Sequence, residues 1–278
     1  MSTKPAAAVR LGRWTIWVVV LLGAVLAIVP FLWMVGGSFR SEVDLFADPS
    51  RIFPETWTLD GYREVWTELP FLRLVLNSFI FAGVTTVFCL LFDSMAAYAL
   101  SRLRFRGQTL AFWLVIATLM VPIQITLVPV FMMLFDMGWL DTYQGLIIPR
   151  ATSAFGIFLL RQFFLTVPKE LDEAARIDGA NHVRIYWQII LPLAKPALAT
   201  LAVLHFMALW NDLLWPLVMT SSTEMRTLPA GLTLFGGQHV TDHAVLLAGA
   251  TISLLPLAIA FFLAQKYFVR GVATTGIK

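Results

Sequence analysis

Long apolar runs separated by short polar stretches dominate the hydropathy pattern of this chain. A helix that crosses the hydrocarbon core of a membrane, roughly 30 Å thick, needs about 20 mostly apolar residues. Six stretches meet this need, at residues 14–35, 74–100, 110–135, 144–164, 196–219 and 244–268. We therefore expect an all-α, polytopic membrane protein with six transmembrane helices. The first run is too long for the apolar region of a signal peptide, so we interpret it as a retained span.

The overall composition supports this class and excludes others. The 278 residues are 59% hydrophobic and only 13% charged, whereas soluble domains are about half apolar and about a quarter charged. The net charge of +3 reflects 20 basic against 17 acidic residues, which does not provide the concentrated basic face of a nucleic-acid binder. The single cysteine, Cys89, lies within an apolar run, and we interpret it as a packing residue.

The distribution of Lys and Arg among the loops predicts the orientation. With the N-terminus in the cytoplasm, 14 of the 20 basic residues fall on the inner side and 6 on the outer side, as the positive-inside rule requires. We therefore place both chain termini in the cytoplasm. The predicted organisation is an N-terminal cytoplasmic segment (1–13), one membrane domain (14–268) and a cytoplasmic tail (269–278).

Two connecting segments are longer than a turn requires. The outer segment at about residues 39–73 is acidic, and the inner segment at residues 165–195 has the pattern of two short helices. In the inner segment, Pro168 suits a first helical turn, and the acidic residues that follow it suit the positive end of the helix dipole. Gly179 is placed for a C-terminal cap of positive φ, and Asn181 for the N-cap of a second helix. From these features alone, an interfacial amphipathic connector is the simplest interpretation.

Motifs for enzymatic chemistry are absent from the sequence. There is no phosphate-binding Gly-x-x-x-x-Gly-Lys-Ser/Thr loop and no His-Glu-x-x-His, Gly-x-Ser-x-Gly or Cys-x-x-Cys motif. His239 and His243 have i, i+4 spacing, but Gly236 and Gly237 nearby favour an exposed outer loop over a metal site. His205 falls in the fifth span, where we expect a hydrogen-bonded packing residue.

The residues of the inner segment change its interpretation. Glu173-Ala174-Ala175, Asp178-Gly179-Ala180, Ile189 and Leu191-Pro192 resemble the EAA loop of ABC importer permeases. Further matches to the carbohydrate-uptake branch of that family occur along most of the chain. They are Asn77-Ser78, residues 96–102, Asp141-Thr142, residues 158–164, Trp210-Asn211, residues 227–232 and residues 265–271. The sequence is similar to the second, six-span permease of maltose-type and glycerol-3-phosphate-type importers.

The resemblance implies a type I ABC importer permease fold in the bacterial cell (inner) membrane. This subunit would form half of a translocation pore with a sister permease subunit, in contact with membrane lipid. Two ATP-binding subunits and an extracytoplasmic solute-binding protein would complete the complex. The first helix of the inner segment would be the coupling helix that seats on the ATPase. The chain itself would be non-catalytic and without a cofactor, because the partner ATPase binds ATP and magnesium.

Polar residues within the predicted spans are candidates for the solute path, because buried ionisable groups in membranes are costly. We select Gln124, Asn211, Asp212 and Trp215, with amide and carboxylate groups for hydroxyls and an indole for stacking on a sugar ring. Membrane anchoring of Trp215 and snorkelling of Asp212 are the structural alternatives. For Asp93 we favour a structural hydrogen bond.

Three other functions compete with a carbohydrate importer permease. A permease for amino acids, metals or phosphate can share the EAA loop but usually lacks the flanking motifs. An ion-coupled secondary transporter often shows inverted repeats, and none is visible here. A membrane enzyme needs convergent reactive side chains. The sequence does not identify the transported solute.

Overall fold

A computed structural model of the chain describes residues 6–236 and 242–275. Over these residues the secondary structure is helical and contains no strand, which confirms the all-α prediction. The chain divides into two compact units, residues 1–69 with 232–254 and residues 70–231 with 255–278. We describe the two units separately.

The first unit contains one long helix and several short ones. Its elements are α1 (Ala6–Gly37), α2 (Glu42–Ala47), α3 (Asp60–Glu68), η4 (Thr233–Gly236) and the beginning of α15 (His243–Thr275). The apolar side chains of α1 are exposed along most of its length, as expected of a helix that faces lipid or another membrane helix. Its small core contains Leu45, Val65, Val245 and Ala248.

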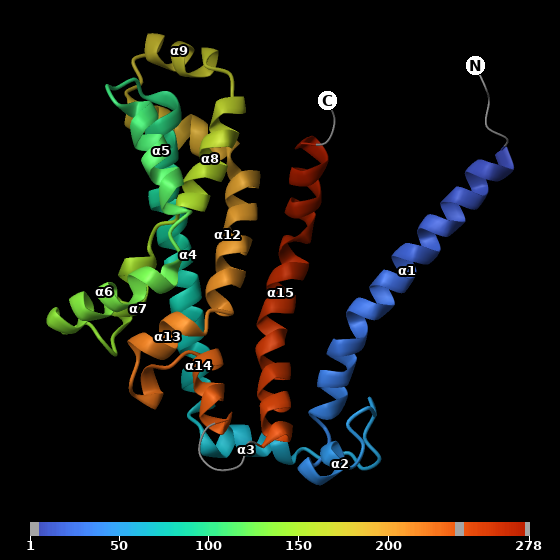
Figure 1. Cartoon of the computed structure of the whole chain (residues 1–278). Helices are drawn as coiled ribbons and strands as arrows, with labels where there is room; N and C mark the ends of the chain where they lie inside the picture. Colours follow the sequence, from blue (N-terminus) through green and yellow to red (C-terminus); the bar gives the residue numbers. More distant parts are fainter. Residues whose placement is uncertain (1–5, 237–241, 276–278) are drawn as a thin grey trace. The chain divides into compact units, whose positions relative to one another are not determined.

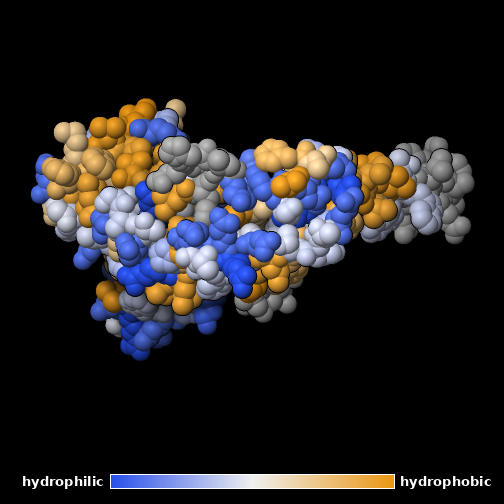
Figure 2. Space-filling view, turned by 90° about the horizontal axis from the view of Figure 1, so that it is seen from below, coloured by the Kyte–Doolittle hydropathy of each residue, from blue (hydrophilic) through white to orange (hydrophobic). Residues whose placement is uncertain are grey.

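Polar contacts fix the segment between α1 and α3. The guanidinium of Arg40, 1% exposed, donates to the Asp44 carboxylate at 2.7 Å and to the carbonyls of Asp48 and Arg51, each at 2.9 Å. Glu42 lies at the first turn of α15, where its Oε2 accepts from the Ala244 N–H at 3.0 Å and its Oε1 lies 2.8 Å from Nδ1 of His243. Figure 2, which views the molecule from below, shows hydrophilic residues interspersed with hydrophobic ones.

The second unit is built on three helices that pack side by side. These are α4 (Phe71–Arg102), α8 (Ala154–Thr166) and α12 (Lys195–Trp210) (Figure 1). Apolar side chains fill the space between them, including Ala97, Leu160, Phe164 and Leu201, all fully buried. The remaining elements of this unit connect or flank the three helices. They are α5 (Gln108–Thr118), α6 (Ile123–Asp136), α7 (Tyr143–Ile147), η1 (Ile148–Arg150), α9 (Glu170–Ile177), α10 (His182–Ile185), η2 (Tyr186–Ile190), α11 (Leu191–Leu193), α13 (Leu214–Met219), η3 (Thr223–Met225) and α14 (Leu228–Leu232).

Some of the predicted spans form one continuous helix, and others are divided into shorter helices. Among the described residues, only Trp14–Gly37 and Phe71–Arg102 are long and apolar enough to cross a membrane as single helices. The total rises to four if two bent helix pairs each count as one span, α5 with α6 at 95° and residues 182–193 with α12 at 76°. Six continuous spans are therefore not confirmed by helix length.

Three predicted spans are interrupted at positions where a helix ends or begins. In the third span, α5 ends at Thr118 and Pro122 precedes α6. In the fourth, Ser153 is the N-cap of α8, so the continuous helix begins only at residue 154. In the fifth, α12 ends at Trp210 and α13 begins at Leu214. An apolar composition predicts that a segment lies in the membrane, but it does not show where capping side chains and prolines interrupt the helix.

Candidate functional site

The part of the inner segment that resembles the EAA loop forms a short helix, α9 (Glu170–Ile177), and a glycine in the left-handed conformation follows it. Helix α9 carries Glu170, Asp172 and Glu173 in its first turn, where negative charge is favoured by the helix dipole. After the C-cap Asp178, Gly179 adopts a φ of +81°, which confirms the predicted positive-φ position. The Gly179 N–H donates to the Arg176 carbonyl, and the next N–H donates to the Ala175 carbonyl.

Exposure divides the residues of this segment into two faces. Glu173, Ala174, Asp178, Gly179 and Pro192 are exposed, Ala180, Ile189 and Leu191 are half-buried, and Ala175 is buried. Ala175 packs into the core formed by α4, α8 and the residues that follow α9. The two alanines therefore differ, since Ala174 lies on an outer surface and Ala175 holds the helix against its own chain.

An exposed apolar strip accompanies Ala174 on the outer surface. Leu171 is 41% exposed and Ile177 is 87% exposed. Together with the exposed Ala174, they present apolar side chains at every third position of α9. Val183 and Trp187, in the helix that follows, are 65% and 51% exposed. Adjacent exposed apolar side chains of this kind mark a surface that another molecule covers.

A buried ion pair attaches the other face of α9 to the end of α4. Arg102 and Asp172 lie 3.3 Å apart, with 2% and 7% of their side chains exposed. The Arg102 guanidinium also donates to the carbonyls of Phe164 and Val167, at 2.5 and 2.7 Å. One arginine therefore joins three elements, the end of α4, the end of α8 and the first turn of α9.

The second half of the segment is joined to α4 by hydroxyl groups. Asn181 caps α10 by accepting from the Arg184 N–H at 2.9 Å, as predicted. The hydroxyls of Ser94 and Tyr186 lie 2.7 Å apart. Tyr186 begins the π-helical turn η2, an irregularity that is frequent at functional sites.

A polar cavity of about 430 Å³ lies beside these anchors. Its lining includes Arg102, Arg104, Lys169 and Arg176 together with Asp172 and Glu173. The cavity and the exposed strip of α9 belong to the same part of the chain.

The polar residues predicted for the solute path do not form one cluster. Gln124 and Asn211 are exposed, and the Asn211 amide donates to the Met207 carbonyl at 2.8 Å. Asp212 Oδ1 accepts from the Trp215 N–H at 3.2 Å, and its Oδ2 forms an ion pair with Arg150 at 3.0 Å. Trp215 is 3% exposed, and its indole donates to the Leu146 carbonyl at 3.0 Å.

Trp215 lines a second cavity of about 550 Å³ within the same unit. Arg150 contributes to this lining and lies over the Trp215 ring, with 5.7 Å between its Cζ and the ring centroid. Three residues with hydroxyl groups also line this cavity, Thr126, Thr152 and Ser153. An aromatic ring beside a cation and hydroxyl groups suits a polar solute with apolar faces.

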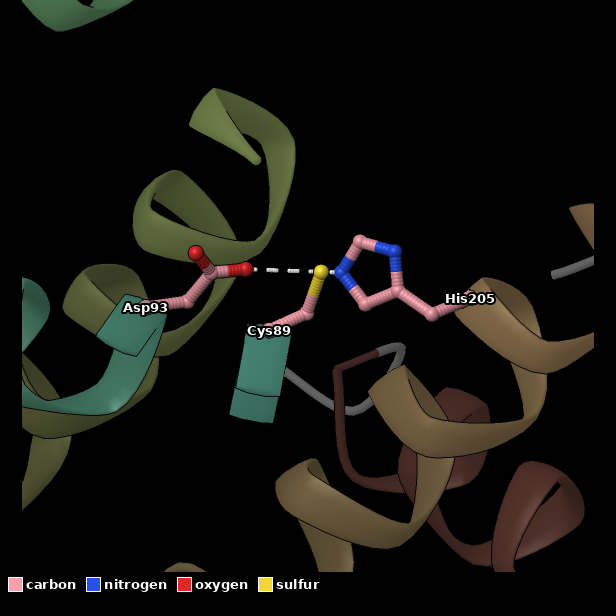
Figure 3. Close-up of side chains that lie close together, drawn as sticks. All are labelled: Cys89, Asp93 and His205. Atoms are coloured by element: carbon pink, nitrogen blue, oxygen red, sulfur yellow. Dashed lines mark ion pairs between the residues drawn. The ribbon is translucent and has the colours of Figure 1, made fainter. Parts of the chain in front are cut away.

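Asp93 makes the structural hydrogen bonds predicted for it. Its Oδ1 accepts from the Thr152 hydroxyl at 2.7 Å and from the Ser153 N–H at 2.9 Å. Its Oδ2 faces Nε2 of His205 at 3.4 Å, and Cys89 lies beside the two (Figure 3). His205 is nearly buried, which fits a packing position, but its Nε2 has no hydrogen-bond partner.

Sequence analysis missed Arg102, Arg150 and the pairing of Asp93 with His205. Arg102 entered the sequence analysis as a loop charge and as the last residue of a motif match, and Arg150 entered it only as a loop charge. A basic residue at the end of an apolar run can satisfy buried carbonyls of neighbouring segments. The i, i+4 pair of His239 and His243 is outside what the structure describes, because His239 falls in residues 237–241.

Comparisons with known proteins agree with this architecture. Residues 91–274 match the family of binding-protein-dependent transport system inner membrane components. The chain is 35% identical over its whole length to the probable ABC transporter permease protein YurM of Bacillus subtilis, covering 93% of that protein. It is 36% identical to the arabinooligosaccharides transport system permease protein AraQ of Halalkalibacterium halodurans, over 92% of each chain. The sn-glycerol-3-phosphate transport system permease protein UgpE of Yersinia enterocolitica is 34% identical, with 91% of this chain and 93% of that protein covered.

A solved structure shows the same fold. A chain of a bacterial ABC transporter involved in import of the acidic polysaccharide alginate matches with a TM-score of 0.82 and 28% identity, over 96% of this chain and all of that chain. The fold and the matched sequence define an ABC transporter permease, an integral membrane protein. The chain belongs to the family of binding-protein-dependent transport system inner membrane components.

Proposed function

We propose that this permease imports a carbohydrate or a related polyol or glycerophosphate and couples to a separate ATPase through α9. The observation that carries the coupling role is the two-faced packing of α9. Its inner face is fixed by the buried pair Arg102–Asp172, while Leu171, Ala174 and Ile177 remain exposed on its outer face. A partner that pushes on the exposed face would move α4 and α8 together, because Arg102 connects them.

The carbohydrate assignment is supported by the relatives. AraQ is described as an arabinooligosaccharide permease and UgpE as a glycerol-3-phosphate permease, and the similar solved structure imports alginate. An importer for amino acids or phosphate, or an ion-coupled transporter, is not favoured by these matches. The cavity beside Trp215 and Arg150 is our candidate for the solute path. Asp212 would hold Arg150 in place through their ion pair. Gln124 and Asn211 would be exposed polar positions on this path.

We propose six membrane passages with both termini in the cytoplasm. The bent pair α5–α6 would form one passage, and α12 together with α13 would form another. A sister permease would complete the pore, two ATP-binding subunits would bind ATP and magnesium, and a solute-binding protein would deliver the solute outside. An alginate transporter of the same fold was crystallised in complex with a pentasaccharide-bound periplasmic protein, which supports the last partner.

The acidic outer surface of the first unit is our candidate docking site for the binding protein. Burial and the neighbouring carboxylates of Asp242 and Glu68 raise the pKa of Glu64, as expected where negative charges lie close together. The outer loop at residues 220–243 is a second candidate, of which residues 237–241, including Gly237, are outside the described structure. Reversing the charge of Glu64 and Glu68 should weaken docking in a salt-dependent way.

Reconstitution of the complex in proteoliposomes tests the proposal. Uptake of labelled oligosaccharide and ATP hydrolysis should both require the loaded binding protein. Ala174→Arg places a bulky charge on the exposed face of α9 and should abolish uptake, while Ala174→Ser should retain it. Uptake without any ATPase, or full uptake by Ala174→Arg, would contradict the proposed coupling.

A further inference from the structure

Three metal-binding side chains converge between α4 and α12. Two of them, Cys89 and His205, line the cavity that we propose for the solute path. Cys89 and Asp93 are separated by one turn of α4, and His205 approaches from α12 (Figure 3). One ligand atom from each, Sγ, a carboxylate oxygen and an imidazole nitrogen, lies within 4.8 Å of the others. All three are held on rigid helices rather than on loops.

Two of these atoms are buried without a hydrogen-bond partner. Asp93 Oδ2 and His205 Nε2 are both unsatisfied, although polar groups buried away from water are almost always hydrogen-bonded. A hydrogen bond between a carboxylate and a charged nitrogen is about 2.7–2.9 Å long. The separation of 3.4 Å between these atoms is too long for that bond.

The same separation fits two ligands of one metal ion. Zinc bonds to carboxylate oxygen and to imidazole nitrogen are about 2.0–2.2 Å long, so two such ligands at the tetrahedral angle lie about 3.3–3.5 Å apart. The other carboxylate oxygen of Asp93 is held by Thr152 and by the Ser153 N–H. A hydrogen bond of this kind orients a metal-binding carboxylate from outside the coordination sphere.

We propose that Cys89, Asp93 and His205 form a binding site for a divalent transition metal such as zinc. Sulfur and imidazole ligands select zinc and its neighbours over magnesium and calcium, which prefer oxygen. Binding removes the thiol proton of Cys89, which leaves to solvent, and ends the hydrogen bond that Sγ donates to the Arg150 carbonyl at 3.2 Å. The thiolate and the carboxylate then balance the two positive charges of the ion, so the site is neutral within the membrane domain.

The surroundings leave room for an ion and its fourth ligand. Cys89 and His205 both line the cavity of about 550 Å³, where the hydroxyl-bearing residues Thr126 and Ser153 also lie. A water molecule from this cavity would complete a four-coordinate site. Because the ligands come from α4 and α12, the bound ion would join these two helices.

Metal binding is tested on the full chain, purified in detergent with its transport partners. Equilibrium dialysis against zinc should give one ion per permease chain, with magnesium and calcium failing to compete. Cobalt, used as a coloured substitute, should show a thiolate-to-metal charge-transfer band. The Cys89→Ser variant should lose this band, and it changes the packing by a single atom, so its fold should be retained.

Further variants separate this site from adventitious surface binding. Asp93→Asn and His205→Gln should each lower zinc affinity at least about 10-fold, and Thr152→Val should lower it about 10–100-fold because the orienting hydrogen bond is lost. His243→Gln is the control, because His243 is exposed and pairs with Glu42 elsewhere. Equal zinc binding by wild type and Cys89→Ser, or no zinc-dependent rise in the thermal stability of wild type, would overturn the proposal.

Discussion

Arg102 and Asp172 form a buried ion pair, 3.3 Å between Nη1 and Oδ2, between the last turn of α4 and the first turn of α9. Removal of one partner of a buried pair leaves an uncompensated charge and typically costs about 3–5 kcal/mol. We expect Asp172→Ala to lower the thermal stability of the purified complex and to uncouple ATP hydrolysis from uptake. Glu170→Ala is the matched control, because Glu170 is an exposed acidic residue in the same first turn of α9. Equal losses in the two variants would show that the pair is not the connection.

Gly179 should tolerate only residues that adopt a left-handed conformation. Its φ is +81°, and a Cβ added there would meet no neighbouring atom within 4 Å, so the effect of substitution is one of backbone strain. An L-residue costs roughly 1–2 kcal/mol in this region, and Asn costs less than others. Gly179→Val should therefore reduce uptake, with Gly179→Asn close to wild type in a transport assay. Identical uptake by the Val and Asn variants would argue against strain.

Ala175→Arg is expected to abolish uptake for a reason different from Ala174→Arg. Ala175 is 9% exposed and packs in the core beneath α9, so a buried arginine would displace the helix from its own chain. The amount of the Ala175→Arg variant in the membrane should fall. The amount of ATPase that it retains in pull-down experiments should also fall. Ala174→Arg should keep normal yield and lose only the ATPase.

Gly156 should be sensitive to a single methyl group. A Cβ there would lie 3.0 Å from His205 Nε2 and in direct collision with the Asp93 carboxylate. Overpacking of this kind costs about 1–3 kcal/mol. The control is Gly83→Ala in α4, where a Cβ meets nothing within 4 Å and should leave stability unchanged or raise it by up to about 1 kcal/mol. Thermal unfolding of both variants measures the difference.

Acid should loosen the contact between α2 and α15. Burial opposes ionisation of Glu42, but hydrogen bonds from His243 and from the Ala244 N–H outweigh it and hold the pKa of Glu42 below its usual value of 4.5. A lowered folded pKa means that the stabilisation is present above the usual pKa and is lost as the pH falls through the folded pKa. The loss should be under about 1 kcal/mol because the pair is partly exposed. The free energy of unfolding, measured against pH, should show this acid-dependent loss in wild type and not in Glu42→Gln.

The distribution of basic residues in the sequence predicts the orientation, and reporter fusions test it. A reporter after Gly107 should be cytoplasmic and one near Asp60 should be external. Opposite labelling at either position would overturn the six-passage topology and place α9 on the wrong side for an ATPase.

The sequence predicted local features of the coupling segment well, because capping depends on neighbouring residues. The left-handed Gly179 and the N-cap Asn181 follow from residue type and spacing. The burial of Ala175 could not be predicted from the sequence, because Ala174 and Ala175 are the same residue type. Only the packing against α4 and α8 distinguishes them. The Asp93–His205 contact joins positions more than a hundred residues apart in the sequence, and no local pattern predicts such a pairing.

Helix continuity was the weakest part of the sequence-based prediction. The run at residues 110–135 contains no charged residue, yet α5 and α6 meet at 95°. Hydropathy reports the preference of a segment for lipid, whereas the bend depends on Pro122 and on the neighbours available to satisfy the freed backbone groups.

The π-helical turn at Tyr186–Ile190 has a consequence for the register of the polypeptide. A π turn accommodates more residues than an α turn, and each residue of an α-helix rotates the direction of its side chain by about 100°. Deletion of one residue within this turn, such as Gln188, would let the turn close as α-helix. The faces of α9 and α12 would then be rotated against each other without any change in their own sequences. Insertions and deletions between α9 and α12 should therefore be far less tolerated than substitutions.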